Sequence, residues 1–380
     1  MITKIGRVKF RDDNRLFGIK EADRFQHLYV IGKTGVGKTT LLRFMAMQDA
    51  KSQNGFCIID PHGDMAEALH QSLHDIPHTY LNLSDPKCRF GYNPLKAVSK
   101  ERISLAVSGF IEVLKSVWFD AWGVRMEHIL RNALYALMET EDSNISDILR
   151  LFTDKDYRYE VARKLQNPTI KEFWLKEYDG YSPGYRQDGT AAIQNKIGAF
   201  LSDPLLRKLL IEPERDISLR RTMDRGDILI VNLAKGRIGS DSANLLGGLL
   251  VTSTGLAAFT RADTPESARK PFFLYVDEFQ NFTTLSLVSM LSELRKYRVG
   301  MVFAHQYVHQ LSTEIRHAIF GNVGSVLAFR VGAEDAPILS KELFEEASSD
   351  ALLRLPNRQF YLRLLIDGEP GKVFSGETVN

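Results

Sequence analysis

The residues from Gly32 to Thr39 follow the spacing G-x-x-x-x-G-K-[ST], which is typical of a loop that binds phosphate. The loop and its first helical residues are Gly32, Lys33, Thr34, Gly35, Val36, Gly37, Lys38, Thr39 and Thr40. Glycines let successive backbone N–H groups turn toward a phosphate, and a Cβ at Gly35 or Gly37 would obstruct its approach. Lys38 supplies a point charge, and Thr39 offers a hydroxyl to Mg²⁺. This chemistry predicts that the chain binds ATP with Mg²⁺.

A second set of candidate residues follows the apolar run from Phe272 to Val276, which ends directly in Asp277 and Glu278. Open α/β sheets place their ligands at the carboxyl ends of buried strands. We expect Asp277 to hold Mg²⁺ through water, and Glu278 to orient and deprotonate the attacking water. An ordinary strand-to-loop exit gives the same pattern. The presence of the phosphate loop in the same chain favours the Walker B site of an ATPase.

Gln306 ends the next apolar run, which begins at Gly300. In the strand order expected of such ATPases, this strand lies between the phosphate-loop strand and the Walker B strand. That position would aim the Gln306 amide at the γ-phosphate of ATP. A polar strand end that is satisfied locally is the alternative interpretation. We expect His305 to pack or to cap, and assign it no chemistry.

Strands that alternate with helices must position these residues. Strand-like runs are His27 to Ile31, Gly55 to Asp60, Asp227 to Leu233, Phe272 to Val276, Gly300 to Gln306, Val323 to Arg330 and Gln359 to Ile366. A helix is predicted directly after the phosphate loop, with apolar residues at 41, 42, 45 and 46. The pattern indicates the α/β class, with a doubly wound and mainly parallel sheet.

Helical periodicity replaces the strand-like runs between about residue 100 and residue 215. One predicted helix has its apolar face at Met126, Ile129, Leu130, Ala133, Leu134, Leu137 and Met138. We therefore expect an all-α domain at 101–215, inserted into a nucleotide-binding domain made of residues 1–100 and 216–380. We expect Trp118, Trp122 and Trp174 to be packing anchors rather than platforms for stacked bases.

The composition limits the functional classes only weakly. The 380 residues include 49 Lys and Arg against 47 Asp and Glu, so a net charge of +2 neither indicates nor excludes a nucleic-acid partner. Only Cys57 and Cys88 occur, and Cys57 lies in an apolar run, which favours a buried thiol in a reducing compartment. We see neither a signal peptide nor an apolar window long enough to span a membrane, so we expect a cytoplasmic protein.

Several motifs together resemble those of the HerA/FtsK superfamily, and most closely those of the cytoplasmic ATPase of conjugative type IV secretion coupling proteins. These motifs are Gly32 to Thr39, Asp60-Pro61-His62-Gly63-Asp64, Trp122-Gly123 with Arg125-Met126-Glu127-His128, Tyr275-Val276-Asp277-Glu278-Phe279 and Ala304-His305-Gln306. The resemblance covers nearly the whole chain. It implies a RecA-like ATPase core with an all-α domain, and a hexameric ring that moves DNA through its centre.

The resemblance also implies a role for Arg295, at the end of a helix predicted between Thr284 and Leu294. In the family, an arginine finger lies eleven residues before the sensor glutamine, which here gives Arg295 and Gln306. Such an arginine acts on the nucleotide of a neighbouring subunit. The alternative is a cation that stabilises the helix C-terminus through the helix dipole.

Coupling proteins usually carry N-terminal membrane helices, and this sequence shows none. A HerA-type DNA translocase that works with a nuclease therefore stays an alternative to a secretion motor with a relaxase or secretion-machinery partner. In the secretion reading, a partner would recruit the protein to the inner face of the membrane. A third hypothesis is a nucleotide-dependent switch that binds partner proteins through the helical domain. For a DNA contact in the pore, the candidate is a loop at Lys235-Gly236-Arg237.

Overall fold

A computed structural model describes residues 1–9, 14–96 and 100–379, and its largest element is an eleven-stranded sheet. The strand order is β2-β1-β15-β12-β11-β3-β10-β9-β4-β8-β5. Its strands are β1 (Ile2–Val8), β2 (Leu16–Lys20), β3 (Leu28–Ile31), β4 (Gly55–Asp60), β5 (Thr79–Asn82), β8 (Ile228–Asn232), β9 (Phe272–Val276), β10 (Val299–His305), β11 (Ser325–Ala328), β12 (Gln359–Arg363) and β15 (Phe374–Thr378). The strands from β11 to β5 are all parallel, and the other pairs are antiparallel, which confirms the predicted α/β class.

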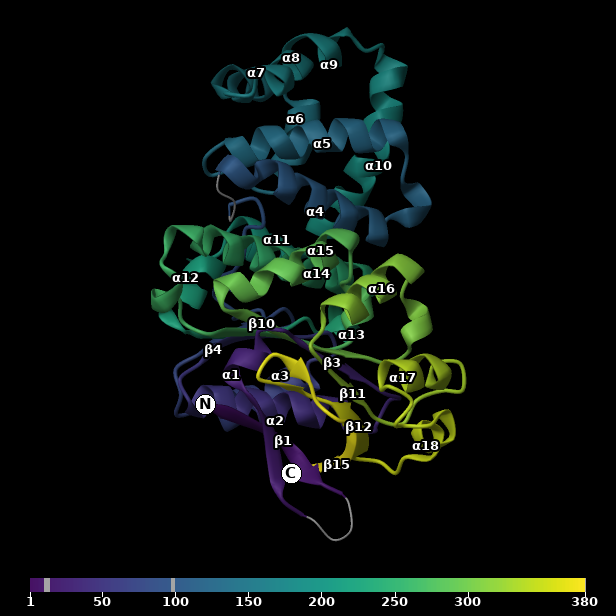
Figure 1. The fold of residues 1–380 in the computed structure, drawn as a ribbon. Coiled ribbons are helices and arrows are strands. Elements are labelled where there is room, and N and C mark those ends of the chain that lie inside the picture. Colours follow the sequence, from purple (N-terminus) through teal and green to yellow (C-terminus); the bar gives the residue numbers. More distant parts are fainter. Residues whose placement is uncertain (10–13, 97–99, 380) are drawn as a thin grey trace.

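Helices cover both faces of this sheet (Figure 1). Helices α2 (Lys38–Lys51) and α3 (Asp64–Ser72) lie on one face, and α12 (Leu219–Arg225), α14 (Ser240–Thr260), α15 (Leu285–Leu294) and α16 (Thr313–Asn322) lie on the other. Successive strand residues point to opposite faces. In β3, Leu28 and Val30 join the apolar core with α2, whereas Tyr29 and Ile31 join the core with α14. Burial on both faces explains why the parallel strands are continuous apolar runs.

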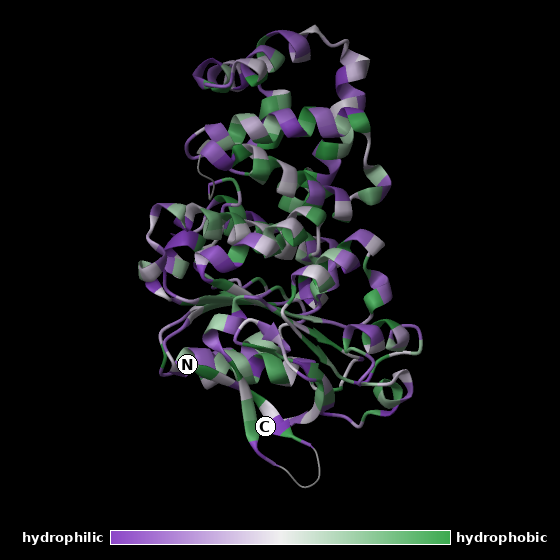
Figure 2. Cartoon of the chain, in the orientation of Figure 1, coloured by the Kyte–Doolittle hydropathy of each residue, from purple (hydrophilic) through white to green (hydrophobic). Residues whose placement is uncertain are grey.

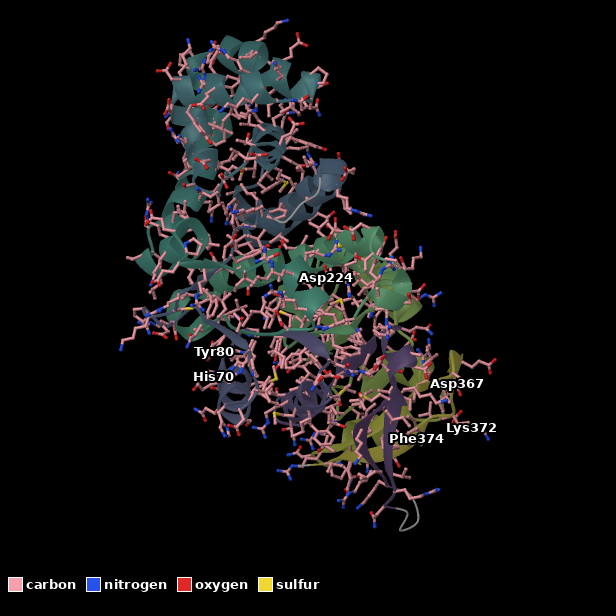
Figure 3. All side chains as sticks on the ribbon, turned by 90° about the vertical axis from the view of Figure 1, so that its left-hand side faces the viewer. His70, Tyr80, Asp224, Asp367, Lys372 and Phe374 are labelled. Atoms are coloured by element: carbon pink, nitrogen blue, oxygen red, sulfur yellow. The ribbon has the colours of Figure 1, made fainter. Side chains whose placement is uncertain are left out.

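Short elements complete the edges of the sheet. Helix α1 (Glu21–Arg24) precedes β3, and α17 (Ala336–Glu342) and α18 (Ser349–Arg354) follow β11. Two small sheets pair β6 (Phe90–Gly91) with β7 (Arg215–Asp216), and β13 (Leu365–Ile366) with β14 (Glu369–Pro370). At the β5 edge, the ring of Tyr80 stacks on His70 of α3 with ring centroids 4.2 Å apart, and Figure 3 labels both residues. Contacts of this kind fix α3 against the outermost parallel strand.

Between β6 and β7, the described residues form helices and the loops that connect them. They are α4 (Ile103–Val117), α5 (Val124–Glu139), α6 (Asp147–Thr153), α7 (Lys155–Lys164), α8 (Pro168–Glu172), a π-helical turn (Phe173–Glu177), α9 (Tyr178–Gly180), α10 (Pro183–Leu201) and α11 (Pro204–Ile211). Helices α8, α10 and α11 begin at Pro168, Pro183 and Pro204, because proline is well suited to the first helical turn. Trp118 and Trp174 are buried, and the half-buried Trp122 donates its indole N–H to Glu127.

The helical region rests on the ATPase-like core through α4, which packs on α14 (Figure 1). Figure 2 shows that apolar residues concentrate along the sheet and the helices that cover it. Sixteen residues of α14 are buried, and an 18-residue apolar window within Ser240–Asp263 is 89% buried. By length and composition this is the single helix of the described residues that could cross a membrane. By length and composition, the expectation that no apolar stretch could span a membrane was therefore wrong for this segment, although its burial is that of a core helix.

Two smaller expectations are settled by local structure. Cys57 and Cys88 are both free and buried, as expected for a chain without a disulfide framework. The segment Lys235 to Arg237 was predicted to be a loop, and it forms the short helix α13 (Lys235–Ile238) instead. The helix begins after Ala234, which has a left-handed backbone, and Lys235 N–H donates to the carbonyl of Pro61.

Candidate active site

The phosphate-loop motif lies at the carboxyl end of β3 and leads directly into α2. Gly35 has a φ of 77° and Gly37 a φ of 121°, a backbone region that residues with a Cβ adopt at a cost. A Cβ at Gly35 would meet no atom within 4 Å. The glycine at this position is therefore required by the backbone conformation of the turn, which directs the loop around the start of α2.

The ammonium group of Lys38 is folded over this loop. It donates to the carbonyl oxygens of Gly32, at 2.7 Å, and of Lys33, at 3.1 Å. The side chain is buried, and burial lowers the pKa of Lys38, while the nearby carboxylates of Glu278 and Asp277 oppose that shift. The loop carbonyls thus hold the cation of Lys38 inside the loop.

Asp277 follows β9 and faces the start of α2. The hydroxyl of Thr39 donates to its Oδ2 atom at 3.0 Å. Burial, together with the negative charges of Glu278 and Asp60, raises the pKa of Asp277 to about 6, because a buried site near other carboxylates disfavours the ionised form. Such a place favours a bound cation. A hydroxyl and a carboxylate side by side are hard oxygen donors, which fit Mg²⁺.

A metal site made of protein side chains alone is not present in the described residues, since no three His, Cys, Asp or Glu side chains gather as ligands. This agrees with the chemistry of Mg²⁺, which usually takes one or two protein oxygens and completes its shell with water and substrate phosphates. Thr39 and Asp277 would hold the ion. Asp60, which the sequence did not single out as a site residue, accepts hydrogen bonds from the backbone of His62 and Ala66 and so turns the 60–63 loop toward Asp277.

Glu278 and Gln306 are joined directly. Gln306 donates from Nε2 to Oε1 of Glu278, and its own Oε1 accepts from the hydroxyl of Thr34 at 3.0 Å. The second oxygen of Glu278 accepts from Gln280 at 2.6 Å. Glu278 is buried and has a left-handed backbone with a φ of 49°. The glutamate side chain is therefore held from both sides, and one amide connects it to the phosphate loop.

The sheet order explains how three distant segments meet. Strand β10 pairs with β3 on one side and with β9 on the other, in parallel register. The residues that follow these strands are the phosphate loop, Gln306 and Asp277, so all three come to one edge. The expected position of the Gln306 strand is thus confirmed. His305 packs as expected, because it is fully buried and its Nδ1 is hydrogen-bonded to Tyr29 Oη at 2.8 Å.

Arg295 lies at the opposite end of the parallel strands, where β10 begins. It caps the C-terminus of α15, just before β10 begins, and seven strand residues separate it from the phosphate-loop edge. At the usual rise per residue this is about 20 Å. The side chain is exposed, and within the described residues it makes no hydrogen bond or ion pair. The structure therefore does not bring Arg295 to Lys38 of its own chain.

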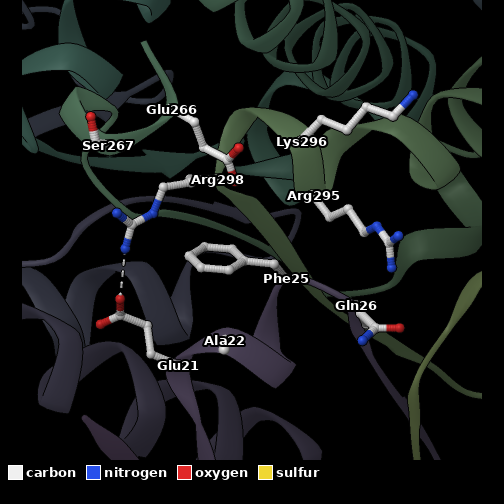
Figure 4. Close-up of a pocket in the computed structure, with 9 residues that line it drawn as sticks. All are labelled: Glu21, Ala22, Phe25, Gln26, Glu266, Ser267, Arg295, Lys296 and Arg298. Carbon is white, nitrogen blue, oxygen red and sulfur yellow. Dashed lines mark hydrogen bonds and ion pairs between the residues drawn. The ribbon is translucent and has the colours of Figure 1, made fainter. Parts of the chain in front are cut away.

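A cavity of about 850 Å³ surrounds Arg295 (Figure 4). Its lining consists of Glu21, Ala22, Phe25, Gln26, Glu266, Ser267, Arg295, Lys296 and Arg298. Arg298 is paired with Glu21 at 3.0 Å, as the dashed line in Figure 4 shows, whereas the guanidinium of Arg295 points away from that pair. Of the three cations that line the cavity, Arg298 is therefore paired within the chain, whereas the side chains of Arg295 and Lys296 have no partner in the described residues.

A family model for the type IV secretion-system coupling protein DNA-binding domain matches residues 18–343. The chain belongs to this coupling-protein family. It is a P-loop NTPase of the coupling-protein type, as the motifs predicted. No curated protein matches the sequence.

Solved structures of a coupling protein and of VirB4 have a similar fold. The bacterial conjugative coupling protein TrwBdeltaN70 has a TM-score of 0.68 and 16% identity, over 98% of this chain and 88% of that chain. Plasmid coupling protein TrwB in complex with ADP and Mg²⁺ has a TM-score of 0.66 and 16% identity, over 98% and 89%. VirB4 of Thermoanaerobacter pseudethanolicus has a TM-score of 0.68 and 15% identity, over 100% and 96%. At these identities the likeness concerns the fold.

Proposed function

We propose that this protein is a ring-forming ATPase that uses ATP hydrolysis to move DNA. The observation that carries the proposal is the separation of two half-sites. The phosphate loop, the acidic pair and Gln306 meet at the carboxyl ends of the parallel strands, whereas Arg295 is exposed at the amino end of β10. Copies arranged head to tail would place the arginine of one subunit at the nucleotide of the next. Heterologous contacts of this kind form a ring when the rotation from one subunit to the next closes on itself.

In the proposed reaction, the loop N–H groups and Lys38 bind the phosphates of ATP. Mg²⁺ held by Thr39 and Asp277 would neutralise charge on the phosphates. Glu278 orients a water molecule for attack on the γ-phosphorus and accepts a proton from that water. The bond from the γ-phosphorus to the β–γ bridging oxygen then breaks, and ADP and phosphate form. Gln306, which contacts both Glu278 and Thr34, would sense the γ-phosphate. Arg295 of the neighbouring subunit stabilises the charge of the transition state.

The assembly and partners follow from the same proposal. The ring is hexameric, DNA passes through its centre, and the protein works in the cytoplasm, where a relaxase or the secretion machinery recruits it to the inner face of the membrane. The family model is that of a DNA-binding domain, and the related TrwB has been solved with ADP and Mg²⁺, both of which support this proposal.

Steady-state phosphate release, measured with and without DNA, tests the proposed function. We expect DNA to stimulate hydrolysis and electron micrographs with ATP and DNA to show rings. Hydrolysis that is unaffected by DNA over a range of DNA lengths would contradict a motor. It would favour a nucleotide-dependent switch that binds proteins.

A further inference from the structure

A turn far along the chain lies against the phosphate loop. The backbone N–H of Arg358 donates to the carbonyl of Val36 at 2.8 Å. The Cα atom of Arg358 lies 3.6 Å from the position that a Cβ of Gly37 would occupy. Arg358 therefore stands directly beside the residues that open α2, although more than 300 positions separate it from them in the sequence.

The backbone of Arg358 is held in an uncommon conformation. Its φ is 71°, in the left-handed region that residues with a Cβ rarely adopt. Two hydrogen bonds fix it there, one to Val36 and one from the N–H of Thr378 to its own carbonyl at 2.9 Å. Strained backbone of this kind persists where the surroundings determine it, and it is concentrated at functional sites. Here it holds the backbone of an arginine beside the phosphate loop.

A second arginine shows what a purely structural role looks like in this turn. The carbonyl of Arg330 accepts from the N–H of Lys33 at 2.9 Å. Its guanidinium donates to the carbonyl of Leu355 at 3.1 Å and to Oδ1 of Asn357 at 2.7 Å. The donors of Arg330 are thus used to hold the turn. The side chain of Arg358 is exposed, and within the described residues its guanidinium has no hydrogen bond or ion pair.

We propose that Arg358 is a nucleotide-binding residue that contacts the phosphates of ATP bound in its own subunit, an inference that rests on the proposed ATPase function. A guanidinium is always charged, and its fork of donors matches phosphate oxygens. The site contains the carboxylates of Asp277, Glu278 and Asp60, and Lys38 is the cation that its loop encloses. A second cation beside the loop complements the negative charge of a polyphosphate.

The test compares the affinities of the full-length protein for ATP and for inorganic tripolyphosphate, both with Mg²⁺, by competition with a fluorescent nucleotide. The first variant is Arg358→Gly, because glycine favours the left-handed backbone and the loss of the side chain then leaves the turn intact. We expect Arg358→Gly to weaken both ligands in parallel, by about 10–100-fold, the usual worth of hydrogen bonds to a charged group. Arg358→Lys should recover part of the affinity.

The matched control is Arg354→Ala on α18, since Arg354 is also exposed and pairs only with Asp350 in the described structure. It should leave both affinities unchanged. If Arg358→Gly weakens ATP but not tripolyphosphate, the side chain contacts the base or ribose and the phosphate proposal is wrong. Unchanged affinity for both ligands would also overturn it. Lys38→Ala, measured in parallel, distinguishes a failure of the Arg358 proposal from a failure of the proposed ATPase function. If Lys38→Ala still binds ATP normally, the proposed nucleotide site itself is wrong.

Discussion

The two ends of strand β10 differ in how their polar side chains are used. At the carboxyl end, Gln306 is hydrogen-bonded to Glu278 and Thr34. At the amino end, Arg295 extends into a cavity without a partner in the described part of the chain. One end is therefore organised by the fold of a single chain, and the other presents a cation without a partner in that chain. In the proposed ring, the fold of one subunit builds most of the hydrolytic site, and the arginine of a neighbouring copy would complete it.

The largest effect should come from the exposed end. Arg295→Ala should lower the rate of ATP hydrolysis by about 10³–10⁵-fold, because a finger stabilises charge that its own subunit's site does not address. ATP affinity and folding should not change. The control is Lys296→Ala, which removes the adjacent exposed cation of the same cavity and should keep normal turnover. Normal turnover of Arg295→Ala would reject the finger.

The organised end should respond next. Glu278→Gln keeps an oxygen that accepts from Gln306 but loses the proton acceptor, so turnover should fall by about 10²–10⁴-fold while ATP still binds. Lys38→Ala should lose ATP binding instead. Nucleotide affinity measured beside phosphate release distinguishes the two. Glu293→Gln, on the exposed side of α15, is the matched control. Full hydrolysis by Glu278→Gln would remove Glu278 from the role of base.

Without bound metal, the carboxylates near Asp277 should also lower the free energy of unfolding at neutral and higher pH. The pKa of Asp277 rises from 3.8 to about 6 in the folded protein, so folding favours its protonated form. The contribution of protonated Asp277 to the free energy of unfolding is fully present below about pH 4, and it is lost as the pH rises through 6. Asp277→Asn should therefore be more stable than the parent at pH 8, by up to about 3 kcal/mol, and similar near pH 4. Urea unfolding with a chelator measures this, and equal stability at pH 8 would contradict it.

The smallest effect concerns the link between the phosphate loop and the sensor. Thr34→Val removes the hydroxyl that donates to Gln306, at a cost of about 1 kcal/mol, or roughly fivefold in turnover. Thr34→Ser retains the hydroxyl and should behave like the parent. Single-turnover hydrolysis with saturating ATP makes the comparison. Equal rates for the valine and serine variants would show that the hydrogen bond does not position Gln306.

Local patterns predicted the parts of the site that lie within single segments. The glycine spacing of the loop, the apolar run before Asp277 and the alternation of strands and helices were enough to predict the fold class, and the strand order expected of such ATPases gave the position of β10. Sequence did not reveal contacts that depend on distant turns. Arg358 meets Val36 only because β12 lies beside β11, and no local pattern marks it. The short helix α13 was missed because it depends on hydrogen bonds to the 60–63 loop.

Mixing two inactive variants tests the central claim most directly. Arg295→Ala and Lys38→Ala are each expected to be inactive, the first for lack of a finger and the second for lack of nucleotide binding. In a mixed ring, some interfaces pair the intact arginine of a Lys38→Ala subunit with the intact phosphate loop of an Arg295→Ala subunit. With subunit exchange shown independently by a fluorescence label, we predict that ATP hydrolysis reappears in the mixture. Mixed rings that show no hydrolysis at any ratio would contradict an arginine that acts on the neighbouring subunit's nucleotide.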